Sequence, residues 1–432
     1  MPKIKKPFKK IQLFQGVKGM PDILPKDQDW WRAVWRAGET TSELHDFYYI
    51  ETPILEPAEL FEASVGEATD IVEKQMYVFK TKGGERVALR PEGSSPVIRS
   101  YLEHHLGYFL TPLKVYYYGQ MFRYERPQAG RERQFHQWGF EIVGDSDPFY
   151  DVQIILTIIS FFNALKIKDL NLKINSVGCR VCRPTYRERL KGYYRDHKSE
   201  LCGDCKIRYE KNPLRILDCK EKECIVLRER APIILDYLCQ NCNNHLKNVL
   251  ELVEDNNIPY EPDPYLVRGL DYYNRTVFEI FSKGEGEKLG ALAAGGRFDY
   301  LSDFLGGRTM PSVGGAIGVE RVIEVMKLEN SSPNFKTKPK TFFITVGDQA
   351  KKTSLKLMQE LRRGGVIVAE AVGKKSLKAQ LKAADKIKSS LALIFGQKEV
   401  FEKSIIIRDM RSGAQETIVL EKMVEEVKKR LH

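Results

Sequence analysis

The chain lacks any long apolar segment. Its longest apolar run, residues 154–165, is broken by three polar side chains, and the basic first ten residues are not followed by an apolar stretch of signal-peptide length. These absences exclude a membrane-spanning protein and predict a cytoplasmic location. With 42% hydrophobic and 29% charged residues among 432, the chain is unlike fibrous and disordered proteins, and it is long enough for two or three domains.

Acidic residues are scarce at the C-terminal end. Residues 336–432 contain 22 lysines and arginines against 11 aspartates and glutamates, so this segment carries the whole net charge of +11. A basic unit attached to a neutral one predicts that a polyanionic macromolecule is held there while chemistry occurs elsewhere; solubility alone is the alternative. We expect the basic first ten residues to form a solvated tail, with nucleic-acid contact as the alternative.

A polar, proline-containing segment at residues 330–340 predicts a linker. Beyond it, strand-like runs such as residues 341–347 alternate with amphipathic stretches such as residues 351–363, which predicts a small α/β domain. This region has neither a Walker loop nor a G-x-G-x-x-G loop. We therefore interpret residues 336–432 as a binding module, separate from residues 1–335.

Two clusters of arginine, carboxylate and tyrosine stand out upstream. Residues 268–279 read RGLDYYNRTVFE, and residues 121–141 read MFRYERPQAGRERQFHQWGFE. Guanidinium groups bind phosphate oxygens in a planar, bidentate way and stay charged when partly buried. The two clusters therefore predict a site for a nucleotide.

Residues 115–123 and 134–143 predict paired strands joined by an arginine-rich loop. Because strand side chains alternate, Gln137, Gly139 and Glu141 share one face of the second strand, and His136 lies on the other with Trp138 and two apolar residues. The polar face fits a substrate pocket. We interpret His136 as a packed or loop-stabilising residue and not as a general base.

Eight cysteines lie within one 64-residue stretch, and three of the four pairs have C-x-x-C spacing. The stretch separates the two arginine clusters, so we expect an insertion domain over about residues 176–256. In a reducing compartment such pairs favour tetrahedral zinc, and two four-cysteine sites can be formed. Ordinary buried thiols are the alternative. The cysteines are Cys179, Cys182, Cys202, Cys205, Cys219, Cys224, Cys239 and Cys242.

Over essentially its full length the chain resembles the histidyl-tRNA synthetases of bacterial type, which are class II aminoacyl-tRNA synthetases. The resemblance rests on the two arginine clusters and on LRPEGSSP (89–96), AAGGRFDYL (293–301) and GGAIGVERV (314–322). It implies an α+β fold with an antiparallel catalytic sheet flanked by helices, a helical cysteine-rich insertion that clamps the tRNA acceptor arm, and a C-terminal α/β domain that reads the anticodon.

The resemblance also implies the reaction. Such enzymes activate histidine with ATP and Mg²⁺ to histidyl-adenylate, then transfer the histidyl group to the 3′ end of tRNA(His). Arg123 is expected on the α-phosphate, Arg321 on the γ-phosphate, and Arg268 near the α-phosphate and the histidine carboxylate. ATP or the acceptor end is expected to contact Glu125, Arg126, Arg131 and Arg133.

For histidine, the resemblance places Glu92 on the α-ammonium group, with Ser94 and Gln137 nearby. Glu141 and Tyr273, next to Tyr272, are expected to bind the two imidazole nitrogens. Phe298 stands where the family commonly has tyrosine, and the missing phenol is expected to weaken histidine binding by about 1 kcal/mol. Ser94 replaces a common threonine and keeps its hydroxyl.

Pro53 matches the proline-bearing motif that forms the dimer interface in class II enzymes, so a homodimer is expected; a proline that merely enters a strand is the alternative. Two other functions compete with the synthetase interpretation. One is a regulatory subunit of histidine biosynthesis, which typically lacks the C-terminal domain and the arginines retained here. The other is an amide ligase that binds no RNA, against which the basic C-terminal segment argues.

Overall fold

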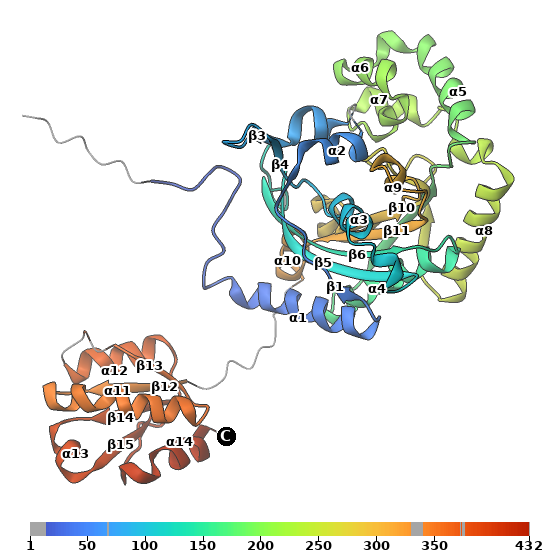
Figure 1. Cartoon of the computed structure of the whole chain (residues 1–432). Helices are drawn as coiled ribbons and strands as arrows, with labels where there is room; N and C mark the ends of the chain where they lie inside the picture. The colour runs from blue at the N-terminus through green and yellow to red at the C-terminus, as the bar shows by residue number, and fades with distance from the viewer. Residues whose placement is uncertain (1–13, 67–68, 330–339, 372, 374–375, 432) are drawn as a thin grey trace, which may run out of the picture. The chain divides into compact units, whose positions relative to one another are not determined.

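The computed structural model of the chain describes residues 14–431, except 67–68, 330–339, 372 and 374–375. The basic first ten residues and nearly all of the expected linker lie outside the described residues. The chain divides into two compact units, Met1–Pro333 and Asn334–His432 (Figure 1). Each unit is described by itself.

An eight-stranded sheet forms the centre of the larger unit. Its strands are antiparallel to their neighbours except at the two edges, where β1 pairs with β5 and β7 pairs with β8 in parallel. In spatial order they are β1 (Tyr48–Tyr49), β5 (Leu113–Phe122), β6 (Gln134–Val143), β11 (Ser312–Gly318), β10 (Ala293–Arg297), β9 (Asn274–Ser282), β7 (Leu170–Ser176) and β8 (Tyr260–Pro262). The predicted strand pair is β5 and β6.

Helices pack on both faces of this sheet. On one face, Trp138 and Phe140 of β6 pack with apolar residues of α1 (Gln28–Leu44), α4 (Pro148–Ala164), α8 (Gln240–Asp255) and α10 (Val319–Leu328). On the other, Tyr117 of β5 joins a core with α2 (Ala58–Val65), α3 (Ser94–Glu103) and α9 (Leu301–Phe304). A smaller sheet, β2 (Leu55–Pro57), β4 (Arg86–Leu89) and β3 (Tyr77–Lys80), lies beside α2. This arrangement confirms the predicted antiparallel sheet with flanking helices.

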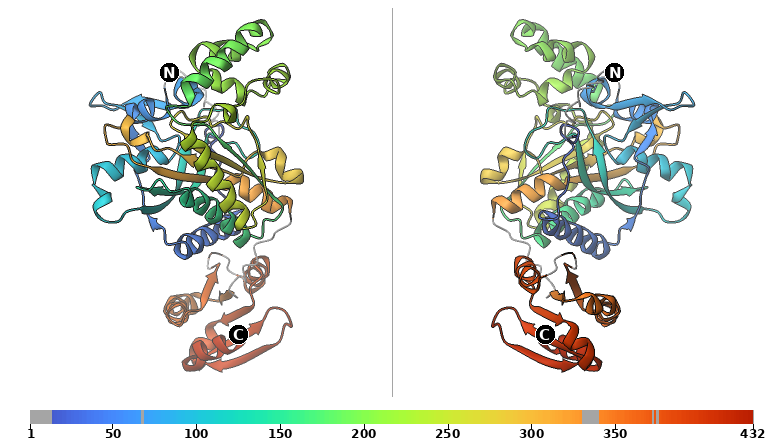
Figure 2. Two further views of the ribbon diagram at one scale, coloured as in Figure 1. Left: turned by 90° about the vertical axis from the view of Figure 1, so that its right-hand side faces the viewer. Right: turned by 90° about the vertical axis from the view of Figure 1, so that its left-hand side faces the viewer.

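The cysteine-rich segment between β7 and β8 is helical, as expected. Its helices α5 (Arg183–Asp196), α6 (Gly203–Lys211) and α7 (Lys222–Arg228), with the short turns η4 (Pro213–Asp218) and η5 (Ile234–Tyr237), share a small core. They stand out from the sheet in Figure 2. The last helix, α8, instead packs along α4, where His245 Nε2 lies 3.3 Å from Asp151 Oδ1.

The smaller unit is a five-stranded sheet in the order β13 (Ile367–Glu370), β12 (Lys340–Thr345), β14 (Leu391–Phe395), β15 (Ser404–Asp409) and β16 (Gln415–Val419). The first three strands are parallel and the last two antiparallel. Apolar cores lie on both faces, and the predicted α/β fold is confirmed. Its helices are α11 (Asp348–Arg363), α12 (Leu377–Lys386), α13 (Gln397–Glu402) and α14 (Met423–Leu431).

Across the described residues of both units, every helix is too short or too polar to cross a bilayer.

Candidate active site

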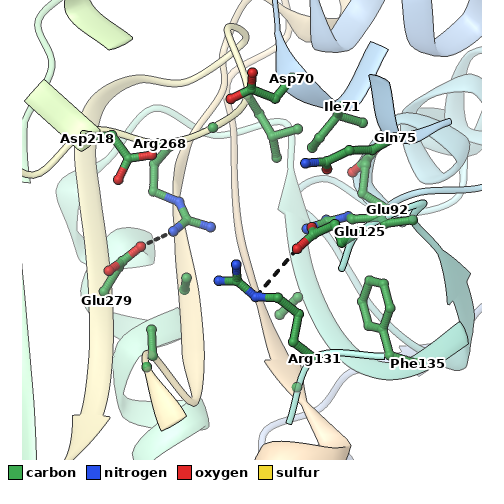
Figure 3. A pocket seen from close by; sticks show the side chains of 18 of the residues that line it. Asp70, Ile71, Gln75, Glu92, Glu125, Arg131, Phe135, Asp218, Arg268 and Glu279 are labelled. Atoms are coloured by element: carbon green, nitrogen blue, oxygen red, sulfur yellow. Dashed lines mark hydrogen bonds and ion pairs between the residues drawn. The ribbon is translucent and has the colours of Figure 1, made fainter. Parts of the chain in front are cut away.

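A cavity of about 960 Å³ lies against the eight-stranded sheet, on the face that carries Tyr117 and Gln137. Its walls come from β5, β6, β9, β10 and β11, from the loop that joins β5 to β6, and from the insertion near residues 202–221. Figure 3 shows side chains from these elements pointing into it. Segments far apart in the sequence therefore meet here.

Two buried carboxylates lie near the first turn of α3: Glu92, just before the helix, and Glu141 of β6. We call this region the carboxylate end. Glu92 accepts hydrogen bonds from the backbone N–H groups of Ser94, at 2.7 Å, and Ser95, at 2.9 Å. The Ser94 hydroxyl donates to Glu141 Oε1 at 2.6 Å. Glu141 Oε2 is buried without a hydrogen-bond partner among the described residues. Glu141 does not itself line the cavity; it lies behind Ser94, which does. Its free oxygen is an acceptor without a donor.

Glycines make room for the polar groups of the carboxylate end. Gly139 pairs with Tyr117 across β5 and β6, and a Cβ at Gly139 would lie 2.1 Å from the Tyr117 ring. A Cβ at Gly314 of β11 would lie 1.5 Å from Glu141 Oε2. Any side chain at these positions would displace the phenol or the carboxylate.

Burial sets the electrostatics of this end. It raises the pKa of Glu141 well above the ordinary glutamate value; the Ser94 hydrogen bond opposes the shift, and the charge of Glu92 adds to it. Burial and the neighbouring carboxylates also raise the pKa of Tyr117 and of Tyr272, whose hydroxyl donates to Glu92 Oε2 at 3.2 Å. A cationic or N–H-bearing ligand suits this surrounding.

A second part of the cavity, which we call the arginine end, presents Arg123, Arg131 and Arg321. Arg123 Nε donates to Pro91 O at 2.9 Å, and Arg321 donates to Gly130 O at 3.0 Å and to Ala291 O at 2.6 Å. Burial lowers the pKa of Arg123 and of Arg321, and for Arg321 the charges of Arg131 and Arg123 lower it further. Backbone carbonyls orient both side chains without cancelling their charge, so this end suits an anion.

Arg268 also lines the cavity. It forms an ion pair with Glu279 of β9, and its guanidinium lies 5.7 Å from the centre of the Tyr273 ring. Asp218 of the insertion is beside Arg268 in Figure 3. Although burial lowers the pKa of Arg268, Glu279 raises it by a larger amount together with nearby tyrosines and Asp218. The guanidinium is therefore charged and held by acidic neighbours.

The loop between β5 and β6 contributes only some of its charged residues. Arg131 Nε lies 3.4 Å from Glu125 Oε2, and both side chains line the cavity (Figure 3). Arg126 is exposed and does not line it. Arg133 stacks 3.9 Å from the Tyr124 ring centre, also outside the cavity.

Three further residues are placed by the strands. Gln137 lines the cavity with its Oε1 unpaired, whereas His136 lies on the opposite face, with Nδ1 2.8 Å from Glu320 Oε1. Phe298 is fully buried behind the tyrosines, its ring centre 5.6 Å from that of Tyr272. It does not line the cavity, which favours a small effect of its missing phenol on histidine binding.

The eight cysteines are free thiols and form two groups, each with four sulfur atoms within 4.8 Å of one another. We call Cys179, Cys182, Cys239 and Cys242 the base cysteines, and Cys202, Cys205, Cys219 and Cys224 the pocket cysteines. Two of the pocket cysteines, Cys202 and Cys219, line the cavity.

The sulfur geometry matches a tetrahedral metal site. Sγ–Sγ separations are 3.7 Å for Cys179 and Cys182, 3.9 Å for Cys179 and Cys239, and 3.8 Å for Cys202 and Cys219. Zinc–thiolate bonds of about 2.3 Å give a tetrahedron edge of about 3.8 Å, whereas a disulfide is about 2.05 Å long. Backbone N–H groups also point at sulfur, for example Cys239 N to Cys182 Sγ at 3.1 Å. Each group can therefore hold a thiolate-bound metal ion.

Sequence reasoning did not single out Tyr117 or Asp218. Tyr117 can be found by pairing the predicted strands, since the register that sets Glu141 on the polar face places Tyr117 opposite Gly139. Asp218 carries no local signal, because only the folding of the insertion brings it to the cavity. Glu279 lies at the end of the RGLDYYNRTVFE motif, but its ion pair with Arg268 appears only in the structure.

Comparisons with known proteins agree with this geometry. A family model described as "Histidyl-tRNA synthetase" matches residues 19–183 and 197–322, and one described as "Anticodon binding domain" matches residues 340–430. A histidine–tRNA ligase from Dehalococcoides mccartyi is 42% identical over 97% of this chain and 100% of its own. One from Natranaerobius thermophilus is 41% identical over 96% and 99%. Apo histidyl-tRNA synthetase of S. aureus superposes with a TM-score of 0.80 at 32% identity, covering 96% of this chain and 100% of that one.

Proposed function

Because this chain belongs to the histidyl-tRNA synthetase family, we propose that its cavity binds histidine at the carboxylate end and ATP at the arginine end. The chain is a histidine–tRNA ligase with a class II fold, which activates histidine and charges tRNA in protein synthesis. One observation carries the assignment of the two ends: the Glu92 carboxylate with Gln137 Oε1, and a group of carbonyl-anchored arginines, line the same cavity.

At the carboxylate end, Glu92 accepts from the α-ammonium group of histidine, and Ser94 and Gln137 lie nearby. Glu141 and Tyr273 bind the two imidazole nitrogens, and Tyr272 holds Glu92 through its hydroxyl. The unpaired Glu141 Oε2 and Gln137 Oε1 support this proposal, because both acceptors lack partners before a ligand binds.

At the arginine end, attack of the histidine carboxylate on the α-phosphate builds negative charge on the phosphate oxygens. Arg123 and Arg268 stabilise this charge, and Arg321 holds the γ-phosphate. Preorganised cations supply most of the catalysis in such a step, since few covalent changes involve the protein. Glu125 and Arg131 position ATP, while the outward position of Arg126 and Arg133 favours the tRNA acceptor end.

Class II synthetases use ATP with Mg²⁺. The carboxylates of Glu125 and Glu279 line the cavity beside the arginines and offer the oxygen ligands that Mg²⁺ takes, so the residues present fit the ion. Bound Mg²⁺ would neutralise charge on the outer phosphates.

We also propose structural zinc in the insertion domain. Both cysteine groups have four thiols at tetrahedral spacing, which supports zinc over the alternative of ordinary buried thiols. Zinc would act on folding and not on the chemical step.

For tRNA(His), we propose a catalytic domain over residues 1–335, with the insertion at about 176–256, and an anticodon-binding domain over residues 336–432. Helix α6 and residues 218–221 of the insertion border the cavity, where they can contact the acceptor arm. The basic charge of the C-terminal domain suits the anticodon stem. A cytoplasmic location follows from this role in translation.

A homodimer is also proposed, with Pro53 at the interface. Exposed apolar side chains flank this proline: Tyr48 and Tyr49 are 47% and 48% exposed, and Leu55 is 45% exposed. In the small sheet that begins with β2, Phe79 of β3 is 46% exposed. Apolar surface of this kind is typical of a protein–protein interface.

ATP–pyrophosphate exchange with each of the twenty amino acids tests the proposed function. Exchange should occur with histidine alone. Exchange with a different amino acid would contradict the assignment of the carboxylate end. Tight binding of histidine or tRNA with no exchange at all would instead indicate a regulatory or purely binding protein.

A further inference from the structure

The two cysteine groups occupy different places in the insertion. Cys179 and Cys182 lie between β7 and α5, and Cys239 and Cys242 lie at the start of α8. The base cysteines thus join the points where the chain leaves the sheet and returns to it. The pocket cysteines lie farther out, at the start of α6, at the end of η4 and within α7.

In the insertion, α6 and residues 218–221 border the cavity, and the pocket cysteines lie within or next to these segments. Asp218 and Lys220 flank Cys219, and all three line the cavity. Asp218 is next to Arg268 in Figure 3, the arginine assigned to the reacting groups. A metal ion on Cys219 would therefore be attached directly to a wall of the active site.

Hydrogen bonds hold the neighbouring segments α6 and η4 on the catalytic domain. Arg215 donates to Gly269 O at 2.8 Å and to Asp70 Oδ2 at 2.9 Å, and Arg208 donates to the same carboxylate oxygen at 2.9 Å. These bonds hold η4 and α6 on the catalytic body. Residues 219–221 join η4 to α7 and are too few to form a core, so Cys219 and Cys224 as metal ligands would fix both flanks of this connection.

The base cysteines do not border the cavity themselves. They are accompanied by Leu238 and lie near Arg183, which donates to Val177 O at 3.1 Å and to Tyr273 O. Cys182 and Cys239 are 57 residues apart, so a shared ion would close a long loop and stabilise the folded insertion. None of the four base cysteines lines the cavity.

We infer that the pocket cysteines form a zinc-organised wall of the active site, whereas the base cysteines form a second zinc site that only fastens the insertion to the body. This inference rests on the proposed function, because it takes the cavity as the site of histidine and ATP. Four thiolates at tetrahedral spacing select a soft, tetrahedral ion, and Zn²⁺ is the ion of that kind expected under reducing conditions.

Two matched substitutions separate the roles. Cys224→Ser and Cys242→Ser each remove one sulfur, and both side chains are 0% exposed. The full-length wild type should contain two zinc ions per chain by elemental analysis, one for each group, and each variant should lose one. Cys224→Ser should raise KM for ATP in pyrophosphate exchange roughly tenfold or more, because small displacements of positioning groups are costly. Cys242→Ser should leave KM within about twofold but lower the unfolding temperature.

Cobalt supplies a readout that does not depend on turnover and that can be recorded in the wild-type protein. Co²⁺ bound by four thiolates absorbs visible light, and its spectrum changes when the site is perturbed. In wild-type protein reconstituted with Co²⁺, addition of ATP and histidine should shift part of the spectrum. The shift should persist in Cys242→Ser, which retains the pocket site, and be absent in Cys224→Ser, which retains only the base site.

The possible outcomes distinguish failure of the two zinc sites from failure of the proposed function. Wild-type protein with no bound metal but full histidine-dependent exchange would overturn the zinc sites and leave the proposed function intact. Two zinc ions, with equal KM changes in the two variants or a cobalt shift from the base site, would overturn the division of roles. Should Cys224→Ser fail to fold, the wild-type cobalt shift and Lys220→Ala decide: no shift and an unchanged KM would refute the wall.

Discussion

The two ends of the cavity are built in opposite ways. At the carboxylate end, side chains and the first turn of α3 bind one another, and the oxygen left over is an acceptor, Glu141 Oε2. At the arginine end, Arg123 and Arg321 are oriented by backbone carbonyls, which leave their positive charge uncancelled. One cavity therefore offers sites for two chemically different ligands, an N–H donor and a polyanion.

Arg268 belongs to neither end, and its substitution should have the largest effect. Arg268→Ala should lower kcat for ATP–pyrophosphate exchange by about 10²- to 10³-fold, the usual cost of losing one charge-stabilising group in a transition state. Steady-state exchange assays measure it. Arg126→Ala is the matched control, because Arg126 is exposed. A decrease of similar size in both variants would remove Arg268 from the reaction.

Glu141→Gln should impair the binding of histidine and not that of ATP. The amide puts an NH₂ group in place of one carboxylate oxygen, and loss of this acceptor should raise KM for histidine by about 10- to 100-fold, while KM for ATP should not change. Arg321→Ala is the reciprocal variant, with the larger effect expected on KM for ATP. Equal effects of Glu141→Gln on both substrates would show that the two ends do not act separately.

Two arginines of the β5–β6 loop differ in position: Arg131 lines the cavity and Arg126 does not. Arg131→Ala should raise KM for ATP about tenfold, since it removes a charged contact to phosphate, whereas Arg126→Ala should leave that KM unchanged. Exchange kinetics at varied ATP measure both. An ATP effect of Arg126→Ala as large as that of Arg131→Ala would contradict the orientation of this loop.

The raised pKa of Glu141 gives a pH dependence of stability. Since the folded pKa lies above the unfolded value of about 4.3, the favourable contribution of protonated Glu141 is complete below that value and is lost as pH rises through the folded pKa. The free energy of unfolding of Glu141→Gln should therefore rise relative to wild type with increasing pH. Urea unfolding between about pH 4 and 8 measures it; a difference that is constant with pH would contradict the shift.

Phe298→Tyr should have the smallest effect on activity. The ring lies behind Tyr272 and outside the cavity, so KM for histidine should stay within about twofold, while the buried hydroxyl costs about 1 kcal/mol of stability. Exchange assays and urea unfolding measure the two effects. A tenfold gain in histidine affinity would instead place the ring in the pocket.

Local pattern accounts for the parts of the site that were predicted. Alternation along residues 134–143 separates Gln137 and Glu141 from His136, because neighbouring strand residues point to opposite faces. The β12 and α11 segments follow from their own apolar spacing. Strand β16 was missed because most of its residues are exposed, which leaves no alternation to detect.

Long-range packing accounts for the rest. Asp218 and Cys219 reach the cavity only through the fold of the insertion, more than 40 residues after β7 ends. The packing of Phe298 against Tyr272 also required the structure, because a motif gives position along the chain but not which side of Tyr272 the ring occupies. The eight cysteines could be paired in sequence, but their division into two groups required the structure.

Calorimetric titration of histidine alone and of ATP alone measures whether the two ends bind separate ligands. Glu141→Gln should weaken histidine binding and leave ATP binding unchanged, and Arg321→Ala should do the reverse. If either variant weakens both ligands equally, or if histidine affinity depends on Arg321 as strongly as on Glu141, the division of the cavity into two opposite ends is wrong.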